Sequence, residues 1–329
     1  MLSQLVFDDD FLLFFKIKHH ISKLARIIGS LLLNVKGDIK KFSIHIDEEY
    51  YSVLDDEDIA HWILFLSRKG VEDFSIGKTG GEPLKLPTHL FSCLELKHLK
   101  LFYCCFNPPA SFHGFPNLLS FKSGLLCYES GKFGKFISQC PSLEILNMRY
   151  GNFGFVKATM IMNFKRDLCE KNIPPFCVGK VKLVDFAKLA NLKLLSMALR
   201  NIVKITNSSG ILELVGSLPT LQELELDFAS CNDDEPTPTV CPSDVDNTTG
   251  LLQLQSVDIS SFKASENAVC LIKYLLVCTP LLKSIVVRPQ YSRFHSRLHS
   301  RLQSDERFKF SRKLLKLHRA SPIAEIGLY

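Results

Sequence analysis

The chain has 329 residues, of which 46% are hydrophobic and 22% charged, and its formal net charge is +6 at pH 7. That composition is typical of a folded protein with an ample apolar core, and it excludes disorder for most of the chain. Ten lysines and arginines lie between Arg288 and Arg319 against two carboxylates, so the remainder is close to neutral and no general attraction to nucleic acid is indicated.

The sequence pattern lacks the marks of membrane insertion and of secretion. It has no run of about 18 apolar residues, the minimum for a spanning helix. Acidic residues, Asp8 to Asp10, stand where a secretory signal would be basic. We therefore expect an intracellular protein, located in the cytoplasm, the nucleus or both.

Two predicted helices lie near the N-terminus, and a strand follows each of them. Apolar residues at helical spacing from about Phe11 to Val35 predict the first helix, which ends before Gly37. Acidic residues at positions 55–58 suit the N-terminus of the second helix, which ends at Gly70. The predicted core positions of the two helices are Ile21, Leu24, Ile28, Leu31 and Leu32, and then Ile59, Trp62, Ile63 and Leu66.

A six-residue pattern, apolar-x-x-apolar-x-apolar, recurs at intervals of roughly 22 to 33 residues, a period that indicates a leucine-rich solenoid. The last two apolar places are two residues apart, so they point to the same face of a strand. One repeat cannot bury that face alone, whereas stacked repeats bury it together. The occurrences are Ile39-Phe42-Ile44, Val71-Phe74-Ile76, Leu96-Leu99-Leu101, Leu118-Phe121-Ser123, Leu143-Leu146-Met148, Leu192-Leu195-Met197, Leu221-Leu224-Leu226, Leu254-Val257-Ile259 and Leu282-Ile285-Val287.

The segments between these strands differ along the chain. Pro and Gly between residues 84 and 148 predict short 3₁₀ or irregular returns. The long interval from Leu143 to Leu192 suggests a degenerate repeat, with its remnant at residues 181–183. Residues 232–250 are acidic and rich in proline, which predicts an exposed loop. The predicted end-piece, which covers the last edge of the sheet, has strands at 256–260, 283–288 and 324–328 and helices at 266–277 and about 305–319.

The predicted fold is therefore α/β. It is a leucine-rich-repeat solenoid, with a curved parallel sheet and helical or irregular returns, closed by a C-terminal αβ cap. We expect the solenoid to occupy residues 1–250 and the cap residues 251–329.

The residues beside the last two apolar places of each repeat lie on the predicted concave face. In the early repeats they are basic and in the late repeats acidic, which would favour a partner of opposite polarity and fix its direction. The simpler interpretation is that exposed strand positions are polar for solubility. The candidate protein-binding residues are Lys41, His98, Lys100, Lys122, Arg149, Glu223, Glu225, Asp227 and Asp258.

Patterns that suggest nucleotide, metal or thiol chemistry have simpler explanations. Gly77-Lys78-Thr79 resembles the end of a phosphate-binding P-loop, but Glu72 stands where that loop needs a glycine. A group of histidines and cysteines lacks the paired spacing of a zinc site, and nothing near its thiols would lower a thiol pKa for reaction with His98 as base. We expect no enzyme, no metal and no cofactor. The group consists of His89, Cys93, His98, Cys104, Cys105 and His113.

Four segments of the chain carry a family resemblance. They read LVFDDDF at residues 5–11, VKGDIKKF at 35–42, CPSLE at 140–144 and RKLLKLHRASP at 312–322. Together they resemble the plant F-box proteins with leucine-rich repeats and a C-terminal FBD domain, and the resemblance covers essentially the whole chain. In that family an F-box grips a Skp-type adaptor of a cullin ubiquitin ligase, and the repeats hold the protein to be ubiquitinated.

The resemblance implies an FBD-like cap and a protein-binding repeat module similar to the substrate-recognition part of an SCF-type ubiquitin ligase. Only four residues precede Leu5, so we expect the chain to lack an adaptor-binding F-box of its own. An unknown target protein on the concave face is the expected partner, no small-molecule substrate is expected, and a link to the Skp-type adaptor and cullin stays open. Two alternatives also stay open: the basic segment 288–319 binds nucleic acid or a membrane surface, or the chain is a non-functional truncated relic.

Overall fold

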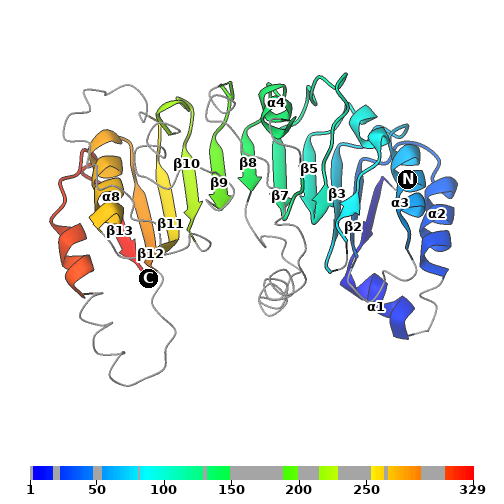
Figure 1. The fold of residues 1–329 in the computed structure, drawn as a ribbon, viewed down its shortest axis with the longest axis horizontal. Helices are drawn as coiled ribbons and strands as arrows, with labels where there is room; N and C mark the ends of the chain where they lie inside the picture. The colour runs from blue at the N-terminus through cyan, green and yellow to red at the C-terminus, as the bar shows by residue number, and fades with distance from the viewer. Residues whose placement is uncertain are drawn as a thin grey trace. The chain divides into compact units, whose positions relative to one another are not determined.

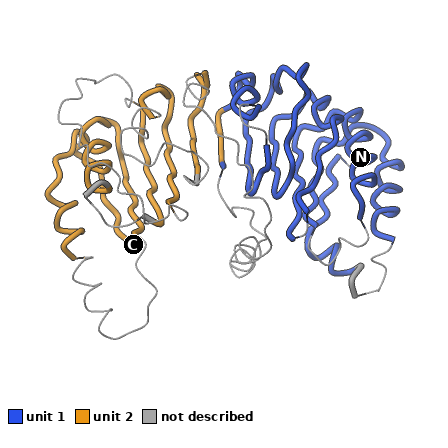
Figure 2. The backbone as a smooth tube through the Cα atoms, viewed as in Figure 1, with its two compact units in different colours: residues 1–143, 148–179 blue, residues 144–147, 180–329 orange. Residues whose placement is uncertain are grey.

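The protein forms two compact units, unit 1 of residues 1–143 and 148–179 and unit 2 of residues 144–147 and 180–329 (Figure 2). Each unit contains parallel strands joined by helical or irregular returns (Figure 1). The structure, a computed structural model, describes residues 3–17, 23–46, 54–80, 82–128, 132–148, 188–198, 215–228, 253–262, 266–289 and 308–329.

Unit 1 contains a parallel sheet in which neighbouring strands follow the order β1-β2-β3-β5-β7. The strand β1 was not predicted; Leu5 and Phe7 pair with Phe42 and Ile44 and are buried with them. The bounds of these strands are β1 (Gln4–Phe7), β2 (Lys41–Ile46), β3 (Asp73–Lys78), β5 (His98–Phe102) and β7 (Ser120–Gly124). A second small sheet pairs β4 (Leu84–Lys85) with β6 (Cys104–Cys105).

The returns of unit 1 are helical at first and then short. The helix predicted from Phe11 to Val35 is in fact two helices, and Leu31, predicted to be buried, is exposed. Asp55 caps the second predicted helix in a capping box with Asp58, which satisfies N–H groups at its N-terminus. The elements are α1 (Asp9–Ile17), α2 (Leu24–Asn34), α3 (Asp56–Leu66), η3 (Thr88–Ser92) and α4 (Lys132–Ser138).

Unit 2 contains parallel strands in the order β8-β9-β10-β11-β12-β13, with all but the last residue of β8 in this unit. β9 is a direct neighbour of β8, although a long interval of sequence separates the two strands. The predicted remnant at 181–183, the acidic loop 232–250 and the domain boundary at 250 lie outside the described residues. The bounds are β8 (Ile145–Met148), β9 (Leu194–Ala198), β10 (Glu223–Asp227), β11 (Ser256–Phe262), α8 (Glu266–Cys278), β12 (Ser284–Pro289), a helix at 308–315 and β13 (Glu325–Leu328).

The apolar pattern read from the sequence forms the core. Every apolar residue of the nine occurrences is buried, and the one polar residue among them, Ser123, is only 5% exposed. The strands β2, β8, β10 and β12 alternate buried with more accessible positions, as expected when one face of a sheet is covered. We call the accessible positions, together with their register partners on neighbouring strands, the outer strand face.

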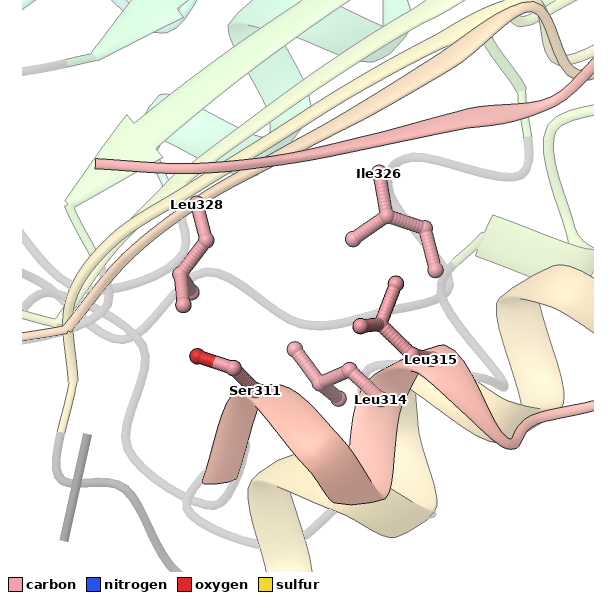
Figure 3. Close-up of a pocket in the computed structure, with 5 residues that line it drawn as sticks. All are labelled: Ser311, Leu314, Leu315, Ile326 and Leu328. Atoms are coloured by element: carbon pink, nitrogen blue, oxygen red, sulfur yellow. The ribbon is translucent and has the colours of Figure 1, made fainter. Parts of the chain in front are cut away.

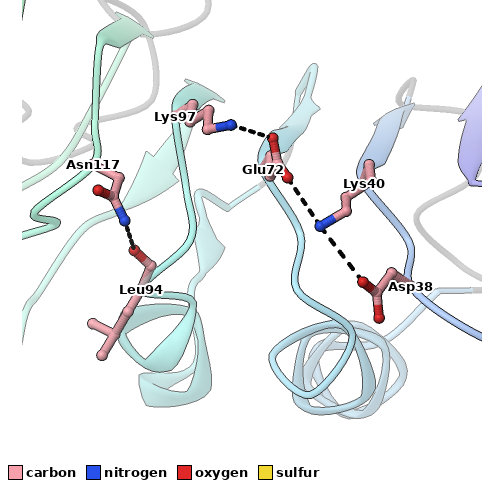
Figure 4. Close-up of polar contacts among 6 residues, drawn as sticks. All are labelled: Asp38, Lys40, Glu72, Leu94, Lys97 and Asn117. Atoms are coloured by element: carbon pink, nitrogen blue, oxygen red, sulfur yellow. Dashed lines mark hydrogen bonds and ion pairs between the residues drawn. The ribbon is translucent and has the colours of Figure 1, made fainter.

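A charged ladder connects the starts of neighbouring strands in unit 1 (Figure 4). The carboxylate of Glu72 lies 2.6 Å from Lys97 Nζ and 2.9 Å from Lys40 Nζ, and Lys40 also lies 3.5 Å from Asp38. Hydrogen bonds from Lys97 and Lys40 hold the pKa of Glu72 far below its usual range, at about 2. The ladder therefore stabilises the stacking of repeats through the ionised form of Glu72.

Side chains in the turns before the strands also bind the preceding repeat. Asn117 Nδ2 donates to the carbonyl oxygen of Leu94 at 3.3 Å (Figure 4), and Ser142 Oγ donates to that of Pro116 at 2.8 Å. In unit 2 Thr220 Oγ1 makes the equivalent hydrogen bond, to the carbonyl oxygen of Ala190 at 2.8 Å. The donor is always the residue just before the first apolar place, so this contact repeats with the sequence.

Where the returns of unit 1 are short, phenylalanine fills the core. Phe136 of α4 is 1% exposed, and its ring centroid lies 4.8 Å from that of Phe106 and 5.4 Å from that of Phe121. Phe115 and Phe133 pack edge-on or tilted against the same ring. Such arrangements are favourable for aromatic pairs beyond the area that they bury.

We expect Phe136→Ala to destabilise unit 1 by about 3–5 kcal/mol, because it leaves a cavity among rings held on several elements. Urea unfolding followed by the fluorescence of Trp62, the chain's one tryptophan, measures the change in unit 1. Leu33→Ala is the control, since Leu33 is 75% exposed and should change little. An equal effect of the two substitutions would contradict the packing described here.

We expect the ladder to make unit 1 sensitive to acid. Because the pKa of Glu72 is lower in the folded chain, its contribution is complete above about pH 4.5 and is lost as the pH falls toward 2. The stability difference between the wild type and Glu72→Gln should therefore shrink over that pH range, as followed by Trp62 fluorescence. Glu95→Gln, at an exposed position, serves as the control. A difference that stays constant down to pH 2 would show that the ladder does not act in this way.

Candidate functional site

The outer strand face of unit 1 brings together the basic residues that the sequence predicted. The strand register places Lys41 beside Asp73, Asp73 beside His98, and Lys100 directly beside Lys122. Lys122 and His98 are exposed, whereas Lys41 and Lys100 are half-buried. Arg149, the remaining predicted basic residue, lies outside the described residues.

The lysines of unit 1 differ in their surroundings. Lys41 Nζ lies 3.2 Å from Asp73 Oδ2, so this lysine is part of an ion pair. Burial lowers the pKa of Lys100, and the positive charges of Lys122 and Lys41 lower it further, against the opposing effect of Asp73. Among the described residues of this face, Lys41, Lys100 and Lys122 accompany one carboxylate, that of Asp73.

The outer strand face of unit 2 is acidic, as predicted. Glu223, Glu225 and Asp227 alternate with buried leucines on β10, and Glu225 is the register partner of Asp258 on β11. Asp258 forms an ion pair with Arg288, whose guanidinium lies 5.7 Å from the ring centroid of Tyr329. The acidic face is thus partly neutralised where β11 and β12 lie side by side.

Two further residues of the outer strand face, Asp73 and Arg288, were not predicted from the sequence. Asp73 precedes Phe74 as Lys41 precedes Phe42, so the repeat pattern contained the signal for the first of them. Arg288 follows Val287 at the end of β12 and was interpreted only as the start of the basic segment. Most of that segment, residues 290–307, lies outside the described residues, so its proposed role is untested.

The residues that suggested nucleotide or metal chemistry have structural roles. Gly77 lies where a Cβ atom would come within 2.8 Å of Phe102 Cβ, so its place in β3 is explained by close packing. β3 ends at Lys78, and the next described element is the strand β4 rather than the helix of a P-loop. Within the described residues, no three histidine, cysteine or acidic side chains are placed to hold a metal ion.

Three buried thiols of unit 1, those of Cys93, Cys104 and Cys140, are unsuited to nucleophilic chemistry at neutral pH. Burial raises the pKa of Cys93 to about 12 and that of Cys140 to about 11, and it raises the pKa of the fully buried Cys104 as well. The thiolate is the reactive form, so these groups are almost wholly unreactive when the protein is folded. In unit 2, Cys270 of α8 is disulfide-bonded.

An apolar pocket of about 330 Å³ lies in unit 2 between the helix at 308–315 and β13 (Figure 3). Figure 3 shows Leu314 and Leu315 of the helix directed toward Ile326 and Leu328 of the strand, with the Ser311 hydroxyl at one end. Of the described residues that line this pocket, four are apolar and one, Ser311, carries a hydroxyl group. Among the described helices, none has the length and apolar character to cross a membrane.

Comparisons with known proteins show that the repeats are similar to those of F-box proteins from plants. The LRR repeats of the FBD-associated F-box protein At5g56370 match residues 59–218 of this chain. The F-box/FBD/LRR-repeat protein At1g13570 of Arabidopsis thaliana is 35% identical over 129 residues, which are 39% of this chain and 30% of that protein. The match thus spans less than a third of that relative.

A solved structure, the leucine-rich repeat-containing protein LegL7 from Legionella pneumophila, is 12% identical with a TM-score of 0.35. The match covers 90% of this chain and 78% of that chain.

Two conclusions drawn from the sequence are thereby confirmed. The chain is similar to the plant F-box proteins with leucine-rich repeats and FBD domains. Its fold is an α/β leucine-rich-repeat fold, with parallel strands whose apolar face is buried and whose returns are helical or irregular.

The reactivity of the cysteine thiols tests whether any of them could serve as a catalytic nucleophile. At pH 8 we expect iodoacetamide to modify Cys93, Cys104 and Cys140 only after unfolding in urea, because burial keeps them protonated and covered. The half-buried Cys127 and Cys278 should react in the folded protein. Peptide mass mapping reports each site. Rapid modification of Cys104 in the native chain would instead support a reactive thiol beside His98.

Proposed function

We propose that this chain is a non-catalytic protein-interaction module, which holds a target protein on its outer strand faces. Its role would resemble that of the substrate-recognition part of an SCF-type ubiquitin ligase. The observation that carries this proposal is the contrast between the constant buried positions and the varied, accessible positions that alternate with them. In repeat proteins such an accessible surface is the part that is available for binding.

The matched family supports the ubiquitin-ligase part of the proposal. The relative named an F-box/FBD/LRR-repeat protein shares the repeat region with this chain. We infer that a target protein is the first partner to seek, with the Skp-type adaptor and cullin as an open question beside it, and that the protein works inside the cell. Anchor residues on the outer strand face, rather than its whole area, would supply most of the affinity.

Both faces can be perturbed without disturbing the core. Ser43 on β2 is half-buried and Glu223 on β10 is exposed. Ser43→Arg therefore places a long, charged side chain on the outer strand face of unit 1, and Glu223→Arg does so on that of unit 2. Lys273 is an exposed residue of α8, and Lys273→Glu alters charge on a return rather than on a strand.

We expect tagged wild-type chain purified from its native cells to retain one or more proteins that a face substitution releases. Recovery by quantitative mass spectrometry should fall at least about tenfold with Ser43→Arg or Glu223→Arg, which corresponds to about 1.4 kcal/mol of binding free energy. Lys273→Glu should leave recovery unchanged, and all variants should retain wild-type circular dichroism.

The identity of the retained proteins decides the finer part of the proposal. A Skp-type adaptor and a cullin among the face-dependent proteins would link the chain to ubiquitination. Other proteins alone would make it a free-standing binding module. If no retained protein depends on either face, the proposed function is wrong.

A further inference from the structure

Two cysteines lie side by side in adjacent repeats of unit 1, and both carry a reduced thiol. Cys105 is the last residue of β6, and Cys127 is its direct partner in an isolated parallel bridge. Backbone hydrogen bonds fix this pairing on both sides. The N–H group of Cys127 donates to the carbonyl oxygen of Cys104 at 2.8 Å, and that of Phe106 donates to the carbonyl oxygen of Cys127 at 2.7 Å. Since the two residues are in register, their side chains extend from the same face.

The spacing of Cys105 and Cys127 is compatible with a disulfide bond. Paired strands lie about 4.7–4.9 Å apart, and the Cα atoms of disulfide-bonded cysteines lie about 4.4–6.8 Å apart. The Cys127 thiol also donates a hydrogen bond to the sulfur of Cys105, so the two sulfur atoms already face each other. A bond between them therefore needs little movement of the backbone.

The neighbouring cysteine of β6, Cys104, faces the other way. Successive residues of a strand point to opposite faces, and Cys104 is fully buried whereas Cys105 and Cys127 are half-buried. Its thiol donates instead to the carbonyl oxygen of Phe102, at 3.2 Å. Of the two thiols of β6, that of Cys105 is therefore the one that both contacts Cys127 and is accessible to a reagent in solution.

The charges around Cys105 favour this thiol as the first to react. Burial raises its pKa, and the hydrogen bond from Cys127 and the positive charge of Lys85 oppose that rise. The carboxylates of Glu82 and Asp56 raise the pKa further. Lys85 of β4 is the register partner of Cys105 on the side opposite Cys127, so the Cys105 thiolate is stabilised from both sides. Because its pKa is raised overall, we expect a slow reaction at neutral pH that becomes faster as the pH rises.

We propose that Cys105 and Cys127 are a redox-active pair, which glutathione disulfide converts into a reversible disulfide bond between two repeats. The Cys105 thiolate attacks one sulfur of glutathione disulfide, forms a mixed disulfide and releases one glutathione thiolate. The Cys127 thiolate then attacks the Cys105 sulfur, so the protein disulfide forms and the second glutathione leaves. The two protons from the cysteines end on the two glutathione molecules, and the two electrons that the cysteines lose reduce glutathione disulfide.

The position of the pair favours a reversible bond over a permanent one. The strand spacing lies at the short end of the range for disulfides, and departures from their preferred geometry make them easier to reduce. Strained or exposed disulfides are the labile and regulatory ones. In cells, where glutathione keeps most thiols reduced, disulfides are usually transient and redox-sensing. When closed, the bond would enclose residues 106–126 and fasten two successive repeats to each other, whether or not a target protein is bound.

The test treats the reduced, folded chain with glutathione disulfide and maps its disulfides by peptide mass spectrometry. Trypsin leaves Cys104 and Cys105 in one peptide, residues 101–122, and Cys127 in another, residues 123–132. Fragment ions then assign the bond to Cys104 or to Cys105. In the folded chain the Cys105 link should exceed the Cys104 link by about tenfold or more, because the backbone holds one thiol toward Cys127 and the other away. In urea the two neighbours should link to Cys127 about equally.

Substitutions and reduction complete the test. Cys105→Ser should abolish the bond to Cys127 in the folded chain, and an excess of reduced glutathione should reopen the bond in the wild type. Cys278→Ser removes a half-buried thiol of unit 2 and is the matched control, which should leave the bond unchanged. Both substituted positions are partly exposed, so the variants should retain wild-type circular dichroism.

Several results would overturn the proposal. They are equal linkage of Cys104 and Cys105 to Cys127 in the folded chain, glutathione adducts on Cys105 without a bond to Cys127, or no reaction of either thiol before the chain unfolds. A bond to Cys127 that persists in Cys105→Ser would assign the reactive thiol to another cysteine. A bond that reduced glutathione fails to reopen would be a permanent cross-link rather than a redox-active pair.

Discussion

Most of the described parallel strands begin beside a carbonyl oxygen that accepts two successive N–H groups from the next repeat. In unit 1 the oxygen of Glu72 accepts from Lys97 and His98 at 2.8 and 2.9 Å. In unit 2 the oxygen of Lys193 accepts from Gln222 and Glu223 at the same distances. The contact recurs at equivalent positions and therefore sets the register of the strands that follow. A slip of one residue would turn every buried leucine toward the outer strand face.

That register also determines which charges become neighbours. It places Lys100 against Lys122 in unit 1 and Glu225 against Asp258 in unit 2. Each such pair costs about 0.2–1 kcal/mol. The buried apolar residues on the opposite face of every strand contribute far more than this, so the fold tolerates unfavourable surface charge. In a scaffold of this kind, residues on the outer strand face can therefore vary with little effect on the stability of the fold.

The returns vary more than the strands because the space behind the sheet can be filled in different ways. Where α2 and α3 form the returns, Leu and Ile from the helices complete the core. Where the returns are short, phenylalanines such as Phe106 and Phe115 occupy that volume instead. Where the returns are short, the turn donors Asn117 and Ser142 keep contact with the preceding repeat. Strand spacing is thus preserved while the length and type of the return change.

The sequence by itself determined the buried positions of the nine repeats, the N-terminus of α3 and the order of strands and helices after residue 253. These features depend on local periodicity and capping, which are properties of short segments. It also placed the candidate residues that the structure describes, all but Arg149, on the outer strand face, because alternation along a strand is local too.

Only the tertiary structure decided which residues lie opposite one another across the strands. It pairs Lys41 with Asp73 and Asp258 with Arg288, and it recruits residues 4–7 as the strand β1. It also brings β9 beside β8 across a long interval in the sequence. Repeats of unequal length give no fixed sequence distance between such neighbours. Their pairing follows instead from the hydrogen bonds and packing that form when the repeats stack.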